Sequence, residues 1–166
     1  MRALGAALVA LAFLAAGLAR ASELRRRAEL LSALVSALEI LGGEISRLAG
    51  LDEAAARLAR SGPRPVRGFF ALFGAGLGRL GELEVSELWD AAARSLPLRG
   101  DEYEALSSAG RCLGRYGADE QLSALARSAQ ELAALAGRAR EQSESGRRLY
   151  AGAGLAAGLL AAIALY

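Results

Sequence analysis

The feature that most restricts the fold is an uncharged run at the end of the sequence, residues 149–166. As an α-helix these eighteen residues would be about 27 Å long, close to the hydrocarbon thickness of a bilayer. An amphipathic stripe leads into this run from Asp119 onward without a convincing break. Its members recur at a spacing of three or four residues: Leu122, Leu125, Ala129, Leu132, Ala136 and Ala139. We therefore expect one long helix that changes from amphipathic to membrane-spanning.

A second uncharged run, residues 3–19, lies between Arg2 and Arg20. As a transmembrane helix it would be about 25 Å long, with flanking arginines that can reach the interface. As a signal peptide it also fits, because Ala19 and Ala21 form an A-x-A-like cleavage site. The segment alone does not separate these alternatives. The second apolar run favours a protein with two membrane anchors.

The arginines predict the orientation of both anchors. All 20 basic residues are arginine, and residues 21–146 carry 16 of them with all 18 carboxylates, so the positive excess lies beside the apolar runs. Against Arg2 alone before the first run, the arginines on the inner side of the two runs are Arg20, Arg25, Arg26, Arg27, Arg138, Arg140, Arg147 and Arg148. The positive-inside rule then puts the middle of the chain in the cytoplasm and both termini outside. This distribution argues against a nucleic-acid surface.

We therefore expect an all-α protein with a transmembrane helix over residues 1–21, a cytoplasmic bundle of about six helices over residues 22–146, and a second transmembrane helix over residues 147–166. No segment alternates with a period of two for long enough to predict a strand. Ser22 is the expected N-cap of the first bundle helix. Its predicted inward stripe is Leu31, Leu34, Leu38, Leu41, Ile45 and Leu48. Gly42 and Gly43 interrupt that stripe, which indicates a kink or a close helix approach.

The rest of the bundle is predicted from turn signals and apolar spacing. Asp52 is the expected N-cap of a short helix, residues 61–65 are a loop, and Ser86 is the expected cap of a later helix that ends before Pro97. The helix after Pro97 is expected to start at Asp101. The residues expected to face the core of these helices are Phe69, Phe70, Phe73, Leu77, Leu80, Leu88, Trp89, Ala92, Tyr103, Leu106, Cys112 and Leu113.

The sequence offers little for catalysis, so we predict no catalytic residue, no cofactor and no metal site. The chain has no histidine and one cysteine, which excludes an internal disulfide framework. Residues 76–81 read G-x-G-x-x-G, but a nucleotide-binding loop needs a preceding strand, so packing and helix termination are the favoured interpretation. The carboxylates near Arg47, Arg57 and Arg60 are expected to form solvated ion pairs. Gly154 and Gly158 form a small-xxx-small pattern that permits membrane-helix packing.

Taken in order, several short stretches resemble the stage III sporulation protein AB family. These are Leu38-x-x-Leu41-x-x-Glu44-Ile45, Leu51-x-Glu53-Ala54, Val66 with Leu72-Phe73, Trp89, Glu104, Leu113-Gly114 with Gln121, and the terminal segment Leu149-Tyr150, Gly154-Leu155 and Gly158-Leu159. The resemblance covers nearly the whole chain. Each stretch is weak by itself, whereas their order and spacing together are fairly specific.

The resemblance implies a scaffold without an enzymatic activity. Such proteins are similar to the cytoplasmic helical domain of inner-membrane platform proteins of type II secretion and type IV pilus systems, and they belong to a complex joining mother cell and forespore. The implied partners are the family's secretion-type ATPase, stage III sporulation protein AA, other membrane proteins of the complex, and a second copy of the chain. Glu44 matches the family's acidic position and is the leading partner-contact candidate, together with Arg47, Glu53 and Arg57. Its alternative role is an ion pair with Arg47 or an exposed carboxylate.

Two other functions remain open at this point. An exported helical protein would lose its signal peptide near Ala21 and keep the C-terminal anchor, with its middle domain outside the cell. A nucleotide binder or enzyme would use the loop at residues 76–81. The first alternative conflicts with the arginine distribution, and the second lacks the strand that such a loop requires.

Overall fold

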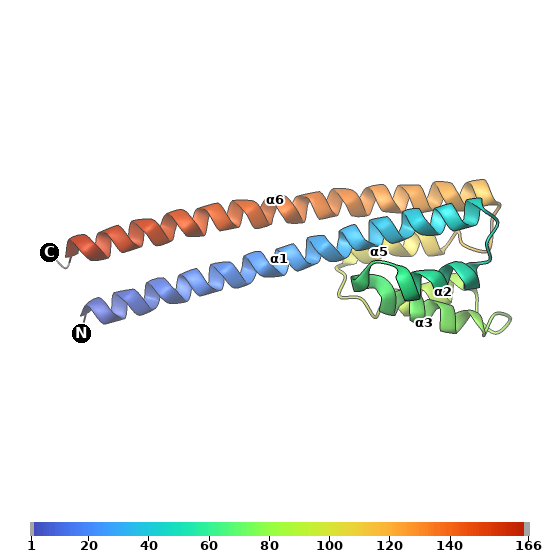
Figure 1. Ribbon diagram of the computed structural model, residues 1–166, viewed down its shortest axis with the longest axis horizontal. Helices are drawn as coiled ribbons and strands as arrows, with labels where there is room; N and C mark the ends of the chain where they lie inside the picture. The colour runs from blue at the N-terminus through green and yellow to red at the C-terminus, as the bar shows by residue number, and fades with distance from the viewer. Residues whose placement is uncertain (1, 165–166) are drawn as a thin grey trace. The chain divides into compact units, whose positions relative to one another are not determined.

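The computed structural model describes the backbone of residues 2–164 and the side chains of residues 15–16 and 19–145 (Figure 1). This part of the chain contains six α-helices, one 3₁₀ helix and no strand, which confirms the all-α prediction. The helices are α1 (Arg2–Ser46), α2 (Leu51–Ser61), η1 (Arg64–Val66), α3 (Arg67–Leu77), α4 (Val85–Ala93), α5 (Gly100–Gly110) and α6 (Ala118–Ala164).

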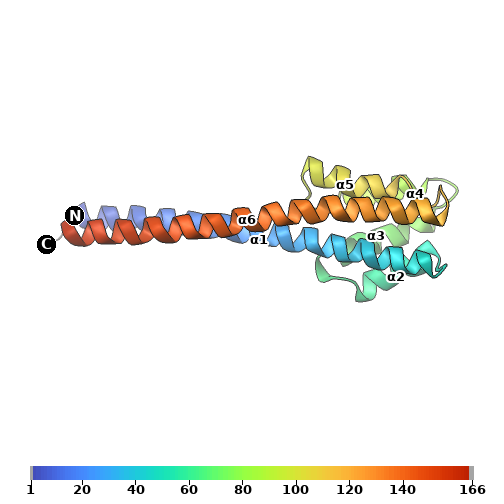
Figure 2. The same ribbon diagram turned by 90° about the horizontal axis from the view of Figure 1, so that it is seen from above.

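The chain divides into two compact units. Unit 1 combines Met1–Ala28 with Gly137–Tyr166, and unit 2 is Glu29–Ala136. In unit 1 the first part of α1 and the last part of α6 run antiparallel (Figures 1 and 2). The Ser143 hydroxyl donates a hydrogen bond of 3.2 Å to the Ala21 carbonyl, which fixes how the two helices are aligned.

The predicted anchors, residues 1–21 and 147–166, fall mainly on residues whose side chains lie outside the described part, including Gly154 and Gly158. Among the described residues, no helix combines the length and hydropathy that a membrane crossing requires. The prediction of one continuous helix from Asp119 onward is confirmed by α6. The expected cap at Ser22 is wrong: α1 passes through this position, and the Ser22 hydroxyl instead bonds the Ala19 carbonyl within the helix.

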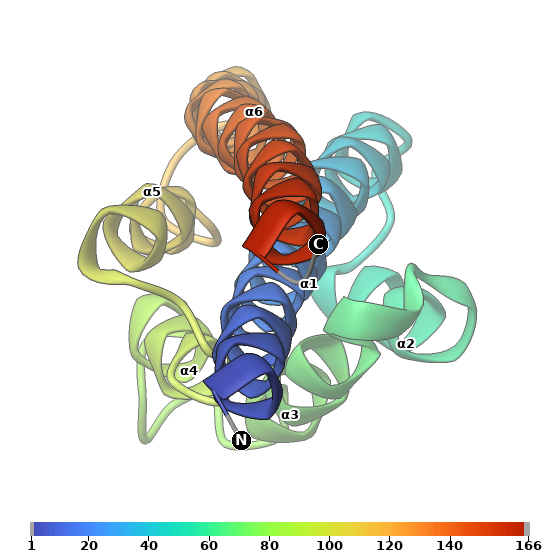
Figure 3. The same cartoon turned by 90° about the vertical axis from the view of Figure 1, so that its left-hand side faces the viewer.

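In unit 2 the helices follow one another in chain order around the bundle (Figure 3). Each of α2, α3 and α4 packs against the next helix along the chain. Ser108 of α5 and Ser128 of α6 share a hydrogen bond of 2.8 Å, and Gly42 of α1 faces Leu122 of α6. A side chain at Gly42 would meet Leu122 at 3.5 Å, an ordinary contact distance, and one at Gly43 would meet open space, so neither glycine is required by a close helix approach.

The centre of unit 2 is aromatic. Trp89 is fully buried, and the rings of Phe69, Phe70 and Phe73 approach its indole edge-on, with centroids 4.8, 6.2 and 5.0 Å away. Edge-to-face pairs of this kind add to the burial of apolar surface. The indole N–H donates to the Leu106 carbonyl at 2.9 Å, so the one polar group of Trp89 is satisfied and ties α4 to α5. These residues were predicted to be core, and that prediction is confirmed.

Several predicted helix ends are wrong by a few residues. Leu48 and Leu80 were expected to face the core but are 89% and 53% exposed, because α1 ends at Ser46 and α3 at Leu77. The cap of α4 is Glu84, which shares a capping box with Glu87, and not Ser86.

Two further expectations need correction for the same kind of reason. Cys112 was placed on a core-facing helix, but it is half-buried in the turn after α5. Gly50, and not Asp52, is the N-cap of α2, and Asp52 lies in its first turn. A glycine offers no side-chain oxygen, so the first-turn carboxylates Asp52 and Glu53 stabilise this helix end through its dipole.

Candidate functional site

The four predicted contact residues meet at the corner where α1 turns into α2. Arg57 of α2 extends one guanidinium nitrogen to Glu44 Oε1 of α1, at 3.2 Å, and the other to Glu53 Oε1, at 3.6 Å. Arg47 approaches the same oxygen of Glu44 at 3.8 Å. We call these residues (Glu44, Arg47, Glu53 and Arg57) the charged corner. The structure therefore brings the four residues together, while their role in binding a partner stays a prediction.

The charged corner has a buried end and an exposed end. The Glu44 side chain is only 8% exposed, whereas those of Arg57, Glu53 and Arg47 are 50%, 63% and 78% exposed. A buried carboxylate is tolerable only with charged or hydrogen-bonding partners, and Arg57 supplies the shortest of these contacts. Glu44 is therefore not an exposed carboxylate. It pairs with Arg47, as its alternative role predicted, and its shorter contact with Arg57 also joins α1 to α2.

The backbone at the end of α1 adds a second unusual feature to this corner. The Leu48 amide bonds the Ile45 carbonyl at 2.9 Å and the Ala49 amide bonds the Glu44 carbonyl at 3.1 Å. This pattern is a Schellman motif, whose left-handed position is usually glycine. Here that position is Leu48, with φ of 62°. A large apolar side chain in a strained conformation is therefore presented to solvent beside the charged corner.

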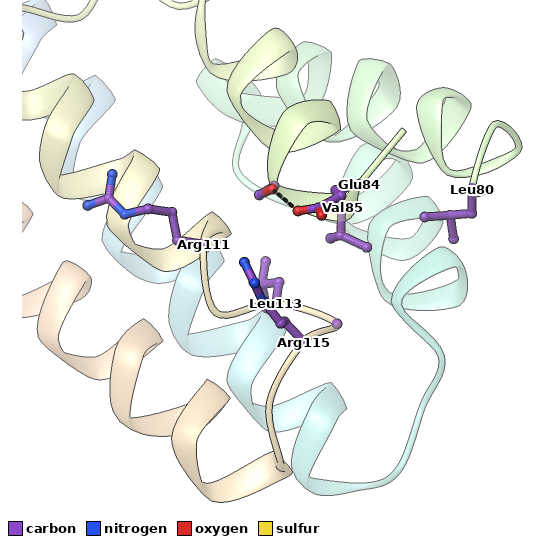
Figure 4. A pocket seen from close by; sticks show the side chains of 8 residues that line it. Leu80, Glu84, Val85, Arg111, Leu113 and Arg115 are labelled. Atoms are coloured by element: carbon purple, nitrogen blue, oxygen red, sulfur yellow. Dashed lines mark hydrogen bonds between the residues drawn. The ribbon is translucent and has the colours of Figure 1, made fainter. Parts of the chain in front are cut away.

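A pocket of about 300 Å³ lies elsewhere in unit 2, between the start of α4 and the turn after α5 (Figure 4). Leu80, Val85 and Leu113 supply its apolar lining, and Arg115 and Glu84 lie at its edge. The Ser86 hydroxyl donates to Glu84 Oε2 at 3.3 Å, within the first turn of α4. Glu84 therefore serves to cap α4, and the side chains that line the pocket form no arrangement that explains a reaction.

The other candidate sites resolve into packing. Gly76 lies where a side chain would come within 3.0 Å of Leu88, and Gly81 has a φ of 109° in the turn before α4. The run at residues 76–81 therefore ends α3 and lets α4 pack closely. This agrees with the prediction that its glycines serve packing and helix termination. A second, shallower pocket of about 470 Å³ includes Cys112 and Tyr116. Among the described side chains no cluster of three His, Cys, Asp or Glu residues could hold a metal ion.

Sequence reasoning missed two features of the bundle. The exposure of Leu48 follows from the helix ending at Ser46, and the dipeptide Ala49-Gly50 just beyond was the available signal for that end. The partly buried hydrogen bond of 2.6 Å from the Ser107 hydroxyl to Asp90 Oδ1 joins α5 to α4. No local sequence pattern predicts this hydrogen bond, because the two residues lie 17 positions apart on different helices.

These observations define a class before any comparison: an all-α protein whose bundle exposes a charged corner and whose two longest helices continue into a second unit, where they pair antiparallel. The family model of stage III sporulation protein AB matches residues 2–166. The chain therefore belongs to the stage III sporulation protein AB family.

A solved structure supports the same fold. Stage III sporulation protein AB (SpoIIIAB) superimposes with a TM-score of 0.63 at 24% identity, over 70% of this chain and 94% of that chain. No curated protein matches the sequence. At this identity the structural likeness concerns the fold, and the family assignment rests on the match along the whole sequence.

Proposed function

We propose that the chain is a non-catalytic, membrane-anchored platform subunit of the stage III sporulation complex and docks the family's secretion-type ATPase. The observation that carries this proposal is the match of the family model over residues 2–166, which takes in the bundle and both uncharged runs together. A platform works by positioning its partners, so it needs exposed surfaces and a fixed attachment more than a reactive group.

The attachment is proposed at both ends of the chain, in the mother-cell membrane around the forespore. Residues 3–19 and 149–166 carry no charge, and arginines flank both runs on the side of the bundle. The antiparallel pairing of α1 and α6 in unit 1 suits a helical hairpin that crosses a bilayer twice (Figure 2). In this arrangement both termini lie outside and the bundle faces the cytoplasm.

The charged corner is the surface we propose for ATPase docking. Its exposed members, Arg47 and Glu53, offer both signs of charge close together, and Leu48 adds an apolar side chain that is 89% exposed. Interfaces commonly combine an apolar anchor with a charged rim that selects the partner. The partly buried Glu44–Arg57 contact joins α1 to α2 at this surface.

Capture of the ATPase by the full-length chain from detergent-solubilised membranes tests the docking surface. Neutralising the two exposed charges, with Arg47→Gln and Glu53→Gln, should reduce capture at least about tenfold, since the partner then loses the charges that select it. Neutralising the exposed Glu104–Arg111 pair with Glu104→Gln and Arg111→Gln, whose contact of 2.9 Å lies on α5 and the turn after it, is the matched control and should leave capture unchanged.

Three results would argue against docking at this corner. The wild-type chain captures no ATPase, the corner variant captures as much as wild type, or the Glu104–Arg111 control loses capture to the same degree. The circular dichroism of each variant must match wild type, because the argument concerns a surface. The four altered side chains, Arg47, Glu53, Glu104 and Arg111, are each more than half exposed, so this condition should hold.

Cysteine labelling in intact cells tests the membrane topology separately. Single cysteines at Ser22 and Ser95, both exposed, and at the C-terminus are introduced in a Cys112→Ala background and treated with an impermeant thiol reagent. Our proposal predicts protection at Ser22 and Ser95 and labelling at the C-terminus. Labelling at Ser95 from outside would favour the exported alternative, in which cleavage near Ala21 would cut α1.

A further inference from the structure

The two units of the chain carry opposite charge, which the overall net charge of +2 conceals. Unit 1 contains nine arginines and three glutamates, a net of +6. Unit 2 contains eleven arginines and fifteen carboxylates, a net of −4. The basic side chains of unit 1 are also concentrated: apart from Arg2, all of them lie within residues 20–27 and 138–148.

The pairing of the two helices in unit 1 brings these two arginine groups to one level. The bond between Ser143 and Ala21 joins residues 122 positions apart and sets the alignment. Both helices rise about 1.5 Å per residue in opposite directions, so Arg26 lies level with Arg138. The neighbouring arginines of the two helices then fall within about two turns of this level. They are Arg20, Arg25, Arg27 and Arg140.

Exposure makes these side chains available for binding. Arg20, Arg26 and Arg138 are all exposed. Arg25 and Arg140 are also exposed and Arg27 is half-buried, but these three make interactions within the chain, so the inference rests on the first three. The carboxylates in the same region are Glu23, Glu141 and Glu144. Arginine therefore dominates the charge of this level.

We propose that Arg20, Arg26 and Arg138 form an arginine belt that binds the headgroups of anionic phospholipids. Arg20 directly follows the uncharged run 3–19, and Arg26 and Arg138 lie about 9 Å further along the helix pair, within a Debye length of a bilayer surface at the end of that run. The inference therefore rests on the proposed membrane attachment. Guanidinium groups match phosphate oxygens in charge and in hydrogen-bond geometry. An arginine at a membrane surface strengthens the attraction of anionic lipid by about fivefold, and salt weakens it.

The test uses the full chain reconstituted into phosphatidylcholine bilayers with a trace of spin-labelled lipid. The fraction of label held at the protein surface is measured for phosphatidylglycerol and for phosphatidylcholine, at low and at high salt. The belt variant combines Arg20→Gln, Arg26→Gln and Arg138→Gln. The matched control combines Arg60→Gln, Arg64→Gln and Arg94→Gln, three exposed arginines of unit 2. A third variant replaces the belt arginines with lysine and so retains the charge.

Wild type and the unit 2 control should prefer phosphatidylglycerol at least about fivefold at low salt and lose this preference at high salt. The belt variant should show little preference, and the lysine variant should keep most of it. Equal preference in wild type and the belt variant overturns the proposal. So does an equal loss in the unit 2 control.

A carbonate wash of the same vesicles separates this proposal from the proposed function. If the wild-type chain stays in the bilayer but shows no lipid preference, the arginine belt is wrong and the membrane attachment stands. If the wash removes the chain from the vesicles, the two-anchor attachment fails, and the belt fails with it.

Discussion

The aromatic core around Trp89 and the charged corner around Glu44 each bury one residue with a polar group, but they satisfy it in different ways. Trp89 is enclosed by three phenylalanine rings and gives its single N–H to a backbone carbonyl. Glu44 is nearly as buried, yet its nearest partners are arginines that are half or mostly exposed. One region is closed to solvent, while the other connects the interior to the surface.

This difference separates the source of stability from the means of recognition. Close packing of large rings stabilises a fold strongly and tolerates little change. Exposed ion pairs contribute little to stability, so their charges can be selected for a partner. The two regions should therefore respond in opposite ways to substitution: the core in the free energy of unfolding, and the corner mainly in binding.

The largest effect is expected from Trp89→Ala. Removing the indole leaves a cavity among three phenylalanine rings and leaves the Leu106 carbonyl without its donor, so the free energy of unfolding should fall by about 3–5 kcal/mol. Thermal unfolding of the full chain in detergent, followed by far-ultraviolet circular dichroism, measures this loss. Trp89→Phe keeps a ring and should cost less than half as much. Equal losses would show that packing around the indole is not the main source of stability.

The next largest effect is expected from Gly110→Ala. A Cβ at this position would overlap the Trp89 indole ring, so α5 or the indole must shift, at a cost of about 1–3 kcal/mol. Gly43→Ala is the matched control, because its Cβ would meet open space and alanine favours the helix. The control should raise the melting temperature, and the Gly110 variant should lower it. Tolerance of Gly110→Ala would contradict the close approach of α5 to Trp89.

At the charged corner, Glu44→Gln should cost about 1–2 kcal/mol, since Arg57 loses its buried carboxylate partner. Arg47→Gln should cost less than about 0.5 kcal/mol, because that side chain is 78% exposed. Chemical denaturation of both variants at low and high salt checks the comparison. If Arg47→Gln lowers the free energy of unfolding as much as Glu44→Gln does, the burial of Glu44 is not the reason for the loss of stability.

The smallest effect on stability, and one of opposite sign, is expected from Leu48→Gly. Glycine relieves the left-handed strain at the end of α1 but makes the unfolded chain more flexible, so the net gain should be about 0.5 kcal/mol. If Leu48 is a docking side chain, the same variant should capture less ATPase. If the Leu48→Gly chain is more stable but captures as much ATPase as wild type, Leu48 is not a docking side chain.

The sequence predicted the apolar interior better than the places where helices end. The spacing of Phe69, Phe70, Phe73 and Trp89 identified the core because large apolar side chains repeat on one face of each helix. Leu48 and Leu80 continue that spacing beyond the ends of their helices, and spacing alone does not reveal where a helix stops. The caps at Ser22 and Ser86 failed because a serine also bonds backbone or nearby side-chain groups inside a helix.

The charged corner was predicted as a set of residues but not as a geometry. Glu44, Arg47, Glu53 and Arg57 drew attention through resemblance and through their mixed charge. Their sequence positions did not show that Glu44 would be buried and Arg57 would bridge two helices, because that depends on the angle at which α2 returns from the end of α1. Such an angle is fixed by the turn at Leu48 and by packing around the whole bundle.

The chain-order arrangement of helices in unit 2 has a consequence for how the bundle folds. Since α2, α3, α4 and α5 each contact a neighbour close in sequence, their pairing needs only short loops to close. The contact of Gly42 with Leu122 joins residues far apart in the chain. We therefore expect the middle helices to assemble rapidly during synthesis, and the seam between α1 and α6 to form last, once the ribosome has released α6.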